Sequence, residues 1–102
     1  MILHMGNMQE IIDKCDEVSA MLRSLSHPVR LKVLCRVLEG ECSVNELTEF
    51  CGIAQSAMSQ FLIRMRAEGL LISRKEKTHV YYGIADSRTK KLLKSIKEIY
   101  CK

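Results

Sequence analysis

Four polar side chains between residues 55 and 60 have the chemistry needed to recognise bases in duplex DNA. Gln and Ser both donate and accept hydrogen bonds, and their side chains are short enough to enter the major groove. The four fall on one side of a predicted helix: Gln55, Ser56, Ser59 and Gln60. Because Met58, Leu62 and Met65 fall on the other side, one face would pack on the protein while the other reads bases. Arg64 lies near the polar face, where it could reach a phosphate.

A basic β-hairpin is predicted directly after this helix. Residues 70–74 and 79–84 are rich in aliphatic and aromatic side chains, as strands are. The intervening residues 75–78 contain neither Gly nor Asn, so we expect a mobile tip longer than a two-residue turn. This tip would present three cations to the DNA backbone: Arg74, Lys75 and Lys77.

Thiols provide a second chemistry, because the chain has five cysteines. Cys15 and Cys35 fall on the apolar stripes of predicted helices, so we expect them in the core, and Cys51 should pack under a turn. Cys42 comes just before a helix start, where the positive end of the helix dipole should lower the pKa of its thiol. Cys101 has Lys97 one turn earlier and Lys102 beside it, and both charges favour its thiolate.

Metal binding is the rival use of these thiols. The three His residues are scattered, and residues 86–102 contain none, so the spacing disfavours a metal site. An enzyme is also disfavoured, because no Cys-x-x-Cys pair and no Cys with a partner His is visible. We expect no bound cofactor.

A mainly α chain must position these groups. Amphipathic helices are predicted over 8–25, 28–40 and 43–50, the last with a capping box formed by Ser43 and Glu46. The polar-faced helix completes a helix-turn-helix over residues 43–68, and the hairpin over 70–84 is its wing. The last helix, within 86–102, has more apolar surface than one small domain can cover. With residues 1–25, it is expected to form the interface of a homodimer.

Size and charge set the remaining bounds. The 102 residues should form a single domain, 1–102. Residues 1–53 hold 5 Lys/Arg against 8 Asp/Glu, whereas residues 54–102 hold 11 against 4, so a polyanion should bind the second half. The N-terminal residues lack the features of a secretion signal, and no apolar stretch approaches a membrane span of about 20 residues. A cytoplasmic protein with no membrane partner is expected.

The motifs in combination resemble one family. Four segments carry the resemblance: residues 25–34 (LSHPVRLKVL), 43–47 (SVNEL), 55–60 (QSAMSQ) and 80–82 (VYY). Together they are similar to the ArsR family of dimeric winged-helix repressors. The resemblance implies a homodimer that occupies a palindromic operator, blocks transcription, and releases the DNA when an inducer binds or modifies it. The chain departs from the family's common pattern at Phe61, where His is usual, and at Lys77-Thr78, where Gly-Arg is frequent.

The cysteines resemble one branch of this family, the persulfide sensors, which have one Cys before the third helix and one at the end of the last. That resemblance implies that Cys42 and Cys101 are reduced in the DNA-binding form. Reactive sulfur species would link them through a disulfide or a polysulfide chain and so lift repression. A metal-responsive repressor of the same family is the alternative.

Overall fold

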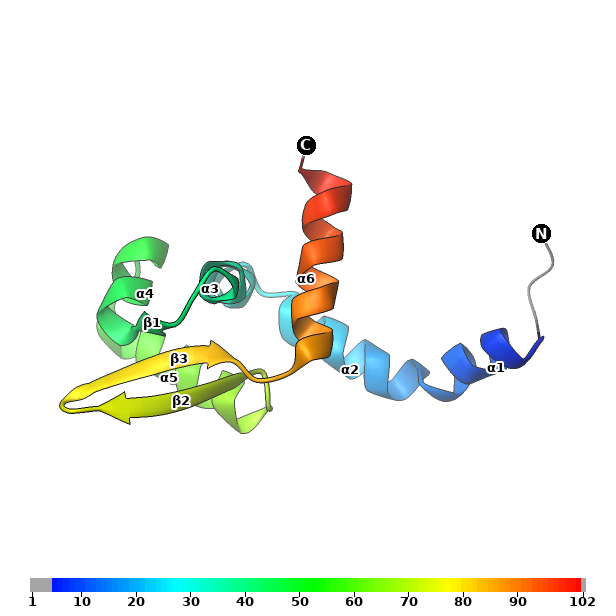
Figure 1. Ribbon diagram of the computed structural model, residues 1–102, viewed down its shortest axis with the longest axis horizontal. Helices are drawn as coiled ribbons and strands as arrows, with labels where there is room; N and C mark the ends of the chain where they lie inside the picture. Colours follow the sequence, from blue (N-terminus) through cyan, green and yellow to red (C-terminus); the bar gives the residue numbers. More distant parts are fainter. Residues whose placement is uncertain (1–4, 102) are drawn as a thin grey trace.

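The computed structural model describes the backbone of residues 5–101 and the side chains of residues 8–101. Along the chain lie α1 (Met5–Asp13), α2 (Cys15–Leu25), α3 (Pro28–Leu38), β1 (Cys42–Ser43), α4 (Val44–Cys51), α5 (Gln55–Ala67), β2 (Leu71–Glu76), β3 (His79–Ile84) and α6 (Ser87–Tyr100). The fold is mainly α with a small antiparallel sheet, and the winged helix-turn-helix predicted from the sequence is confirmed (Figure 1).

Local signals in the sequence fix both ends of α4, the first helix of the helix-turn-helix. The Ser43 hydroxyl accepts a hydrogen bond from the Glu46 backbone N–H at 3.2 Å, and the Ser43 N–H donates to the Glu46 carboxylate at 2.9 Å. This capping box starts α4, and Gly52, in the left-handed conformation at φ 67°, ends it. The apolar faces of the two helices then meet in the core through three fully buried side chains: Leu47, Met58 and Leu62.

The first predicted helix, over residues 8–25, is two helices instead of one. The break is at Lys14, whose ψ of 1° lies outside the helical range and whose N–H is shared between the carbonyls of Glu10 and Ile11. Since Lys14 still accepts a hydrogen bond from Val18, the chain bends without losing its helical path. Apolar periodicity runs through both helices unchanged, so it did not reveal the bend.

We call α1 and α2 together the arm (Met5–Leu25). The arm projects from the body of the molecule (Figure 1), and the Cα radius of gyration is 15.8 Å. A compact domain of this length has a radius of about 13 Å. Large apolar side chains on the arm are exposed: Met8, Ile11, Ile12, Val18 and Leu22.

The sheet differs from the prediction in two respects. A third strand, β1, pairs with β3 through Cys42 with Tyr82 and Ser43 with Tyr81. Two residues are too short to leave a period-2 pattern, so the sequence did not reveal this strand.

The expected long tip of the wing is wrong. Glu76 pairs with His79, so only Lys77 and Thr78 form the turn. Lys77 takes the left-handed conformation, at φ 58°, that Gly or Asn usually supplies in a two-residue turn.

The last helix, α6, begins where the sequence predicts and rises away from the helix-turn-helix. The Asp86 carboxylate accepts from the Arg88 N–H at 2.8 Å as its N-cap. Leu93 packs into the core, whereas Ile99 and Tyr100 are 70% and 81% exposed. No helix in the described part of the chain is long and apolar enough to cross a membrane.

Candidate DNA-binding surface and thiol sites

The polar face of α5 has the orientation predicted from its sequence. Three of its side chains are exposed and Ser59 is half-buried, and none of the four makes a hydrogen bond to another described residue; the exposed three are Gln55, Ser56 and Gln60. On the opposite face, Met58, Leu62 and Met65 are fully buried. The core therefore holds α5 so that a row of free donors and acceptors faces outward, and Arg64 is exposed two turns further on.

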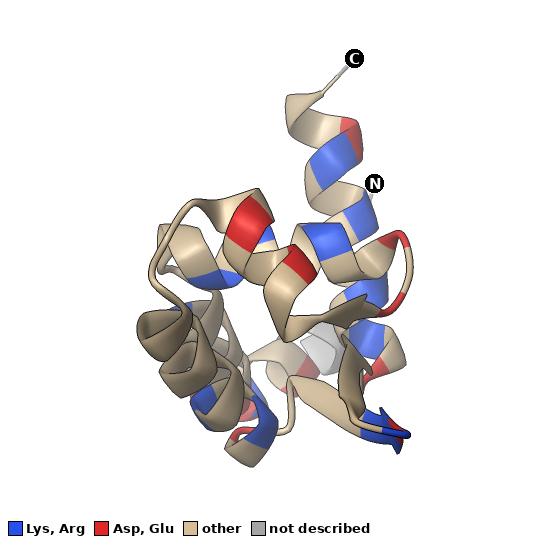
Figure 2. Cartoon of the chain, turned by 90° about the vertical axis from the view of Figure 1, so that its left-hand side faces the viewer, with Lys and Arg blue, Asp and Glu red and all other residues tan. Residues whose placement is uncertain are grey.

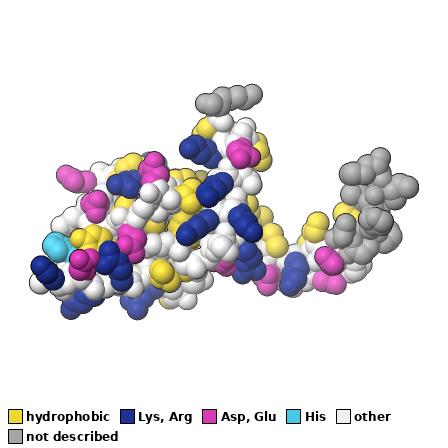
Figure 3. Space-filling view, in the orientation of Figure 1, with side chains coloured by type: hydrophobic (Ala, Val, Ile, Leu, Met, Phe, Trp, Pro, Cys, Tyr) yellow, Lys and Arg dark blue, Asp and Glu magenta, His cyan; other side chains and the backbone are white. Residues whose placement is uncertain are grey.

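Positive charge is concentrated in two separate regions. Lys and Arg gather at the tip of the hairpin and along α6, which rises away from α5 (Figures 2 and 3). Residues 54–84 hold 5 Lys/Arg against 2 Asp/Glu, and residues 86–102 hold 6 against 2. About half of the basic excess in the second half of the chain is therefore on the helix predicted to form the dimer interface, not on the helix-turn-helix and wing.

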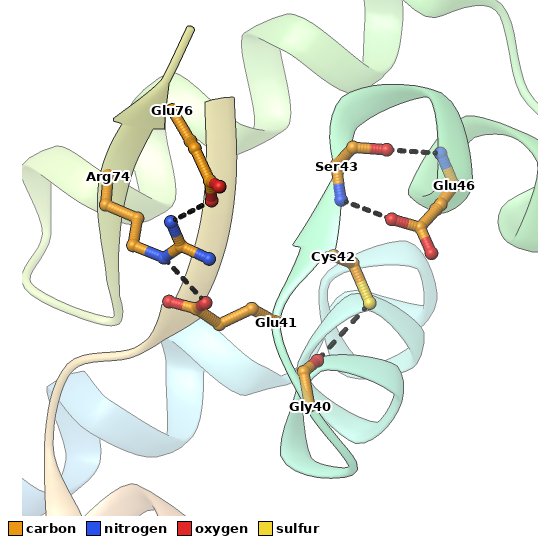
Figure 4. A network of polar contacts seen from close by, with 7 residues as sticks. All are labelled: Gly40, Glu41, Cys42, Ser43, Glu46, Arg74 and Glu76. Carbon is orange, nitrogen blue, oxygen red and sulfur yellow. Dashed lines mark hydrogen bonds and ion pairs between the residues drawn. The ribbon is translucent and has the colours of Figure 1, made fainter. Parts of the chain in front are cut away.

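The three predicted wing cations differ in their surroundings. Lys75 and Lys77 are exposed, and neither forms an ion pair with another described residue. Arg74 is also exposed, but its guanidinium is paired with two carboxylates of the protein (Figure 4): its Nε lies 2.8 Å from a Glu41 carboxylate oxygen and its Nη1 lies 2.7 Å from Glu76. The two carboxylates raise the pKa of Arg74 further above its ordinary value.

The predicted activation of Cys42 is wrong. Its side chain has no exposed surface, and its thiol donates to the Gly40 carbonyl at an Sγ–O distance of 3.4 Å (Figure 4). Burial raises the pKa of Cys42, and the charge of Arg36 only partly opposes that rise. The reason is β1: pairing with β3 turns the Cys42 side chain into the core, where desolvation of the thiolate outweighs the nearby start of α4.

The predicted burial of Cys15 and Cys35 is also wrong. Both are exposed: Cys15 lies on the arm, and the core side of α3 is formed by Val33, Leu34 and Val37 instead of by Cys35. Cys51 is half-buried against the core, as expected, and burial raises the pKa of its thiol.

Among the groups that affect the thiol of Cys35 is Cys101. Cys101, just past the end of α6, is exposed. Partial burial of the Cys35 sulfur raises the pKa of its thiol, and negative charge on Cys101 raises this pKa further. Cys101 is not among the groups that shift the pKa of Cys42. The fold thus brings Cys101 into electrostatic range of Cys35, a pairing that the spacing of the cysteines in the sequence did not indicate.

Among residues 8–101, no three His, Cys, Asp or Glu side chains gather in a way that could hold a metal ion. Lys102, whose charge was expected to favour the Cys101 thiolate, lies outside the described residues.

Comparison with known proteins identifies the family. Residues 27–73 match the model of the bacterial regulatory proteins of the arsR family. The chain is 34% identical to the HTH-type transcriptional regulator YgaV of Escherichia coli over 99 residues, which cover 95% of this chain and 99% of YgaV.

Two solved structures share the whole fold. The transcriptional repressor BigR from Xylella fastidiosa superposes with a TM-score of 0.86 at 33% identity, covering 92% of this chain and 96% of BigR. Reduced HlyU from Vibrio cholerae gives 0.84 at 32% identity, covering 92% and 99%. These relatives are transcriptional regulators and not enzymes. The chain belongs to the ArsR family of winged helix-turn-helix transcriptional regulators, in the branch that contains BigR and HlyU.

Proposed function

We propose that this regulator is a homodimeric repressor that leaves a palindromic operator when reactive sulfur species link two of its cysteines. DNA binding is supported by the exposed polar face of α5. It is supported also by Lys75 and Lys77 of the wing, which form no ion pair with a described residue. Such a face offers hydrogen bonds to base edges, and the adjoining cations neutralise phosphates.

A dimer is supported by the apolar surface that one protomer leaves uncovered. The arm has hydrophobic side chains along the side that faces α6 (Figure 3). Where the arm meets α6, a groove of about 690 Å³ has apolar walls that include Val18, Met21 and Leu92. Exposed apolar surface of this extent on a small domain is typical of a subunit interface. A two-fold dimer would also present two α5 helices to DNA, and half-sites one helical turn apart are spaced by about 34–36 Å.

Cys101 is the member of the thiol pair that the sequence and the structure both favour, and the structure favours Cys35 as its partner over Cys42. Cys35 and Cys101 are both exposed, and negative charge on Cys101 raises the pKa of the Cys35 thiol, whereas Cys42 is buried in the core. A reagent can reach an exposed thiol without unfolding the domain.

A persulfide can join the two cysteines in steps that need no metal. A low-molecular-weight persulfide, R–S–SH, transfers its outer sulfur to the Cys35 thiolate, which becomes a persulfide while the thiol RSH leaves. Attack by the Cys101 thiolate on the Cys35 sulfur then gives a disulfide and releases hydrogen sulfide. If Cys101 is persulfidated as well, the two persulfides combine to a trisulfide and hydrogen sulfide. A direct disulfide requires Cα atoms within about 4.4–6.8 Å, so an inserted sulfur allows a longer separation.

Linking these residues would couple two parts of the molecule. Cys35 lies on α3, which packs against α4 and β3 of the DNA-binding body, and Cys101 ends α6. A bond between them would draw that body towards α6 and change the distance between the two α5 helices of a dimer.

The test is binding to duplexes selected from a random-sequence pool. Affinity should fall steeply with salt, and a glutathione persulfide should abolish it until dithiothreitol is added. Gln55→Ala should relax base preference by about 1–3 kcal/mol, whereas Lys75→Ala should weaken all sequences alike. Binding that is insensitive to salt would contradict DNA recognition by this surface. Release by zinc or cadmium instead of persulfide would support the metal-responsive alternative.

A further inference from the structure

The base of the wing is packed into the core through Leu71, Tyr82 and Ile84, whereas the side chains of its outer part, residues 74–79, are exposed. Strands β2 and β3 pair with each other, and the two residues of β1 pair with β3 beside the segment that starts the helix-turn-helix. In DNA recognition a wing must hold a fixed angle to α5, because both must contact one duplex at the same time. A side chain that ties the wing to the start of α4 would therefore control how well Lys75 and Lys77 are placed.

Arg74 makes that connection (Figure 4). It extends from β2, and its Nε pairs with Glu41, which lies between Gly40 and β1. Its Nη1 pairs with Glu76 on its own strand. The guanidinium carbon also lies 4.9 Å from the centre of the ring of Tyr81, the residue opposite Arg74 on β3.

The Glu41 end of this connection leads directly to the recognition unit. Glu41 is next to Cys42, whose side chain is fixed in the core, and Ser43 follows as the N-cap of α4. The connection thus runs from Arg74 to Glu41 by a charged hydrogen bond, and from Glu41 along the backbone to Ser43, whose capping box starts the first helix of the helix-turn-helix.

We infer that Arg74 is a positioning residue, not a phosphate ligand: with Glu41 it forms a brace that sets the angle of the wing relative to α4 and α5. This inference rests on the proposed DNA-binding function. Binding a phosphate would require Arg74 to leave two carboxylates and an aromatic face, whereas Lys75 and Lys77 have no such partners among the described residues.

Affinity for the selected duplex, measured at several salt concentrations, tests the brace. Glu41→Gln should weaken binding by about three- to tenfold, the usual size of coupling between contacting groups, although it removes a negative charge. Arg74→Ala should weaken binding similarly, and the double variant should be no worse than either single one. Glu39→Gln is the matched control, because Glu39 is an exposed acid near Glu41 that pairs with no described residue. It should leave affinity unchanged or raise it slightly.

The salt dependence separates the two roles of Arg74. A brace leaves the salt slope of Arg74→Ala at the wild-type value, and Lys75→Ala should lower it by about 0.9 for its lost phosphate. If Arg74→Ala lowered the slope as Lys75→Ala does, or if Glu41→Gln bound DNA more tightly than Glu39→Gln, then Arg74 would be a phosphate ligand held back by Glu41. An affinity of Glu41→Gln equal to that of Glu39→Gln would likewise overturn the brace.

A second measurement needs no DNA and so separates failure of the brace from failure of the proposed function. In NMR spectra of the free protein, the Arg74 Nε–H should exchange slowly with water. Glu41→Gln should speed this exchange and that of the β2–β3 amides, whereas Glu39→Gln should not. Fast exchange of the Arg74 Nε–H in the wild type would show that the brace is absent in solution.

Discussion

At the scale of single residues, strand pairing buries one thiol, that of Cys42, while others stay exposed. Cys42 stands beside a helix start, which favours a thiolate, but the pairing of Cys42 with Tyr82 places it in the core and raises the pKa of its thiol. Cys35 and Cys101 stand on surfaces that the domain leaves open. Of the pair predicted from the sequence, Cys101 stays in the proposal, whereas Cys35 replaces Cys42, because the burial of Cys42 depends on packing that periodicity does not show.

Serine variants should distinguish the cysteines that respond to persulfide from those that do not. Cys35→Ser and Cys101→Ser should bind DNA as the wild type does and should resist release by persulfide. Cys15→Ser is the matched control, since Cys15 is an exposed thiol on another helix, and it should be released normally. Cys42→Ser should also be released normally but should lose stability of about 1–3 kcal/mol, because its hydroxyl is buried. If Cys42→Ser resisted release by persulfide while Cys35→Ser was released normally, the Cys42–Cys101 pair predicted from the sequence would be supported instead.

The turn of the wing contains a second informative residue, Lys77. Its left-handed conformation costs about 1 kcal/mol in a side chain with a Cβ, and Gly avoids that cost. Lys77→Gly should therefore be more stable to urea than Lys77→Ala by about this amount. Because both variants lose the same charge, their DNA affinities should fall alike. Equal stability of the two variants would show that the turn is not left-handed in solution.

At the scale of elements, a capping motif that acts over three residues predicted the start of a helix correctly. The capping box predicted for Ser43 and Glu46 is present at the start of α4. The bend at Lys14 and strand β1 were not predicted: the bend leaves the apolar periodicity unchanged, and the two residues of β1 form a strand only by pairing with the distant β3. Arg74 was predicted to face DNA, and its partner Glu41 lies 33 positions away.

The capping box of α4 gives a pH-dependent stability. Hydrogen bonds from Ser43 hold the pKa of Glu46 below its ordinary value. Because the folded protein favours the carboxylate, this contribution is complete above the ordinary carboxyl pKa of about 4.3 and is lost as the pH falls through the folded value. Glu46→Gln should destabilise the protein at neutral pH, because it removes the charged acceptor of the Ser43 backbone N–H, and should do so less in acid. Urea unfolding at both pH values checks this, and an equal loss at both would mean that Glu46 is not engaged.

At the scale of the whole molecule, the extended shape follows from apolar surface that a single copy cannot bury. The principal extents are 54 × 31 × 22 Å, and the long axis runs along the arm (Figure 1). The sequence predicted excess apolar surface on the last helix. The sequence also placed residues 1–25 beside it in the interface, and the structure adds the groove between the arm and α6, so the interface of a two-fold dimer would be continuous across three helices.

Placing a charge on the arm should separate the subunits. Ile11 is 60% exposed in the protomer, so Ile11→Glu should leave the fold intact while burying a carboxylate in the dimer. Sedimentation should show a folded monomer with weak DNA binding. Ile72→Glu is the control, because Ile72 is similarly exposed at 56% but lies on the wing, and it should remain dimeric. A dimer of Ile11→Glu as stable as the wild type would place the interface elsewhere.

We propose that reactive sulfur links Cys35 to Cys101 and that this link releases DNA. The most direct measurement is mass spectrometry of proteolytic peptides from the protein after glutathione persulfide treatment, with the fraction released from DNA followed in the same samples. We predict one cross-linked peptide pair containing Cys35 and Cys101, joined by two or more sulfur atoms, whose yield rises with release. Release accompanied by a Cys42–Cys101 link, or by no link between cysteines, would contradict it.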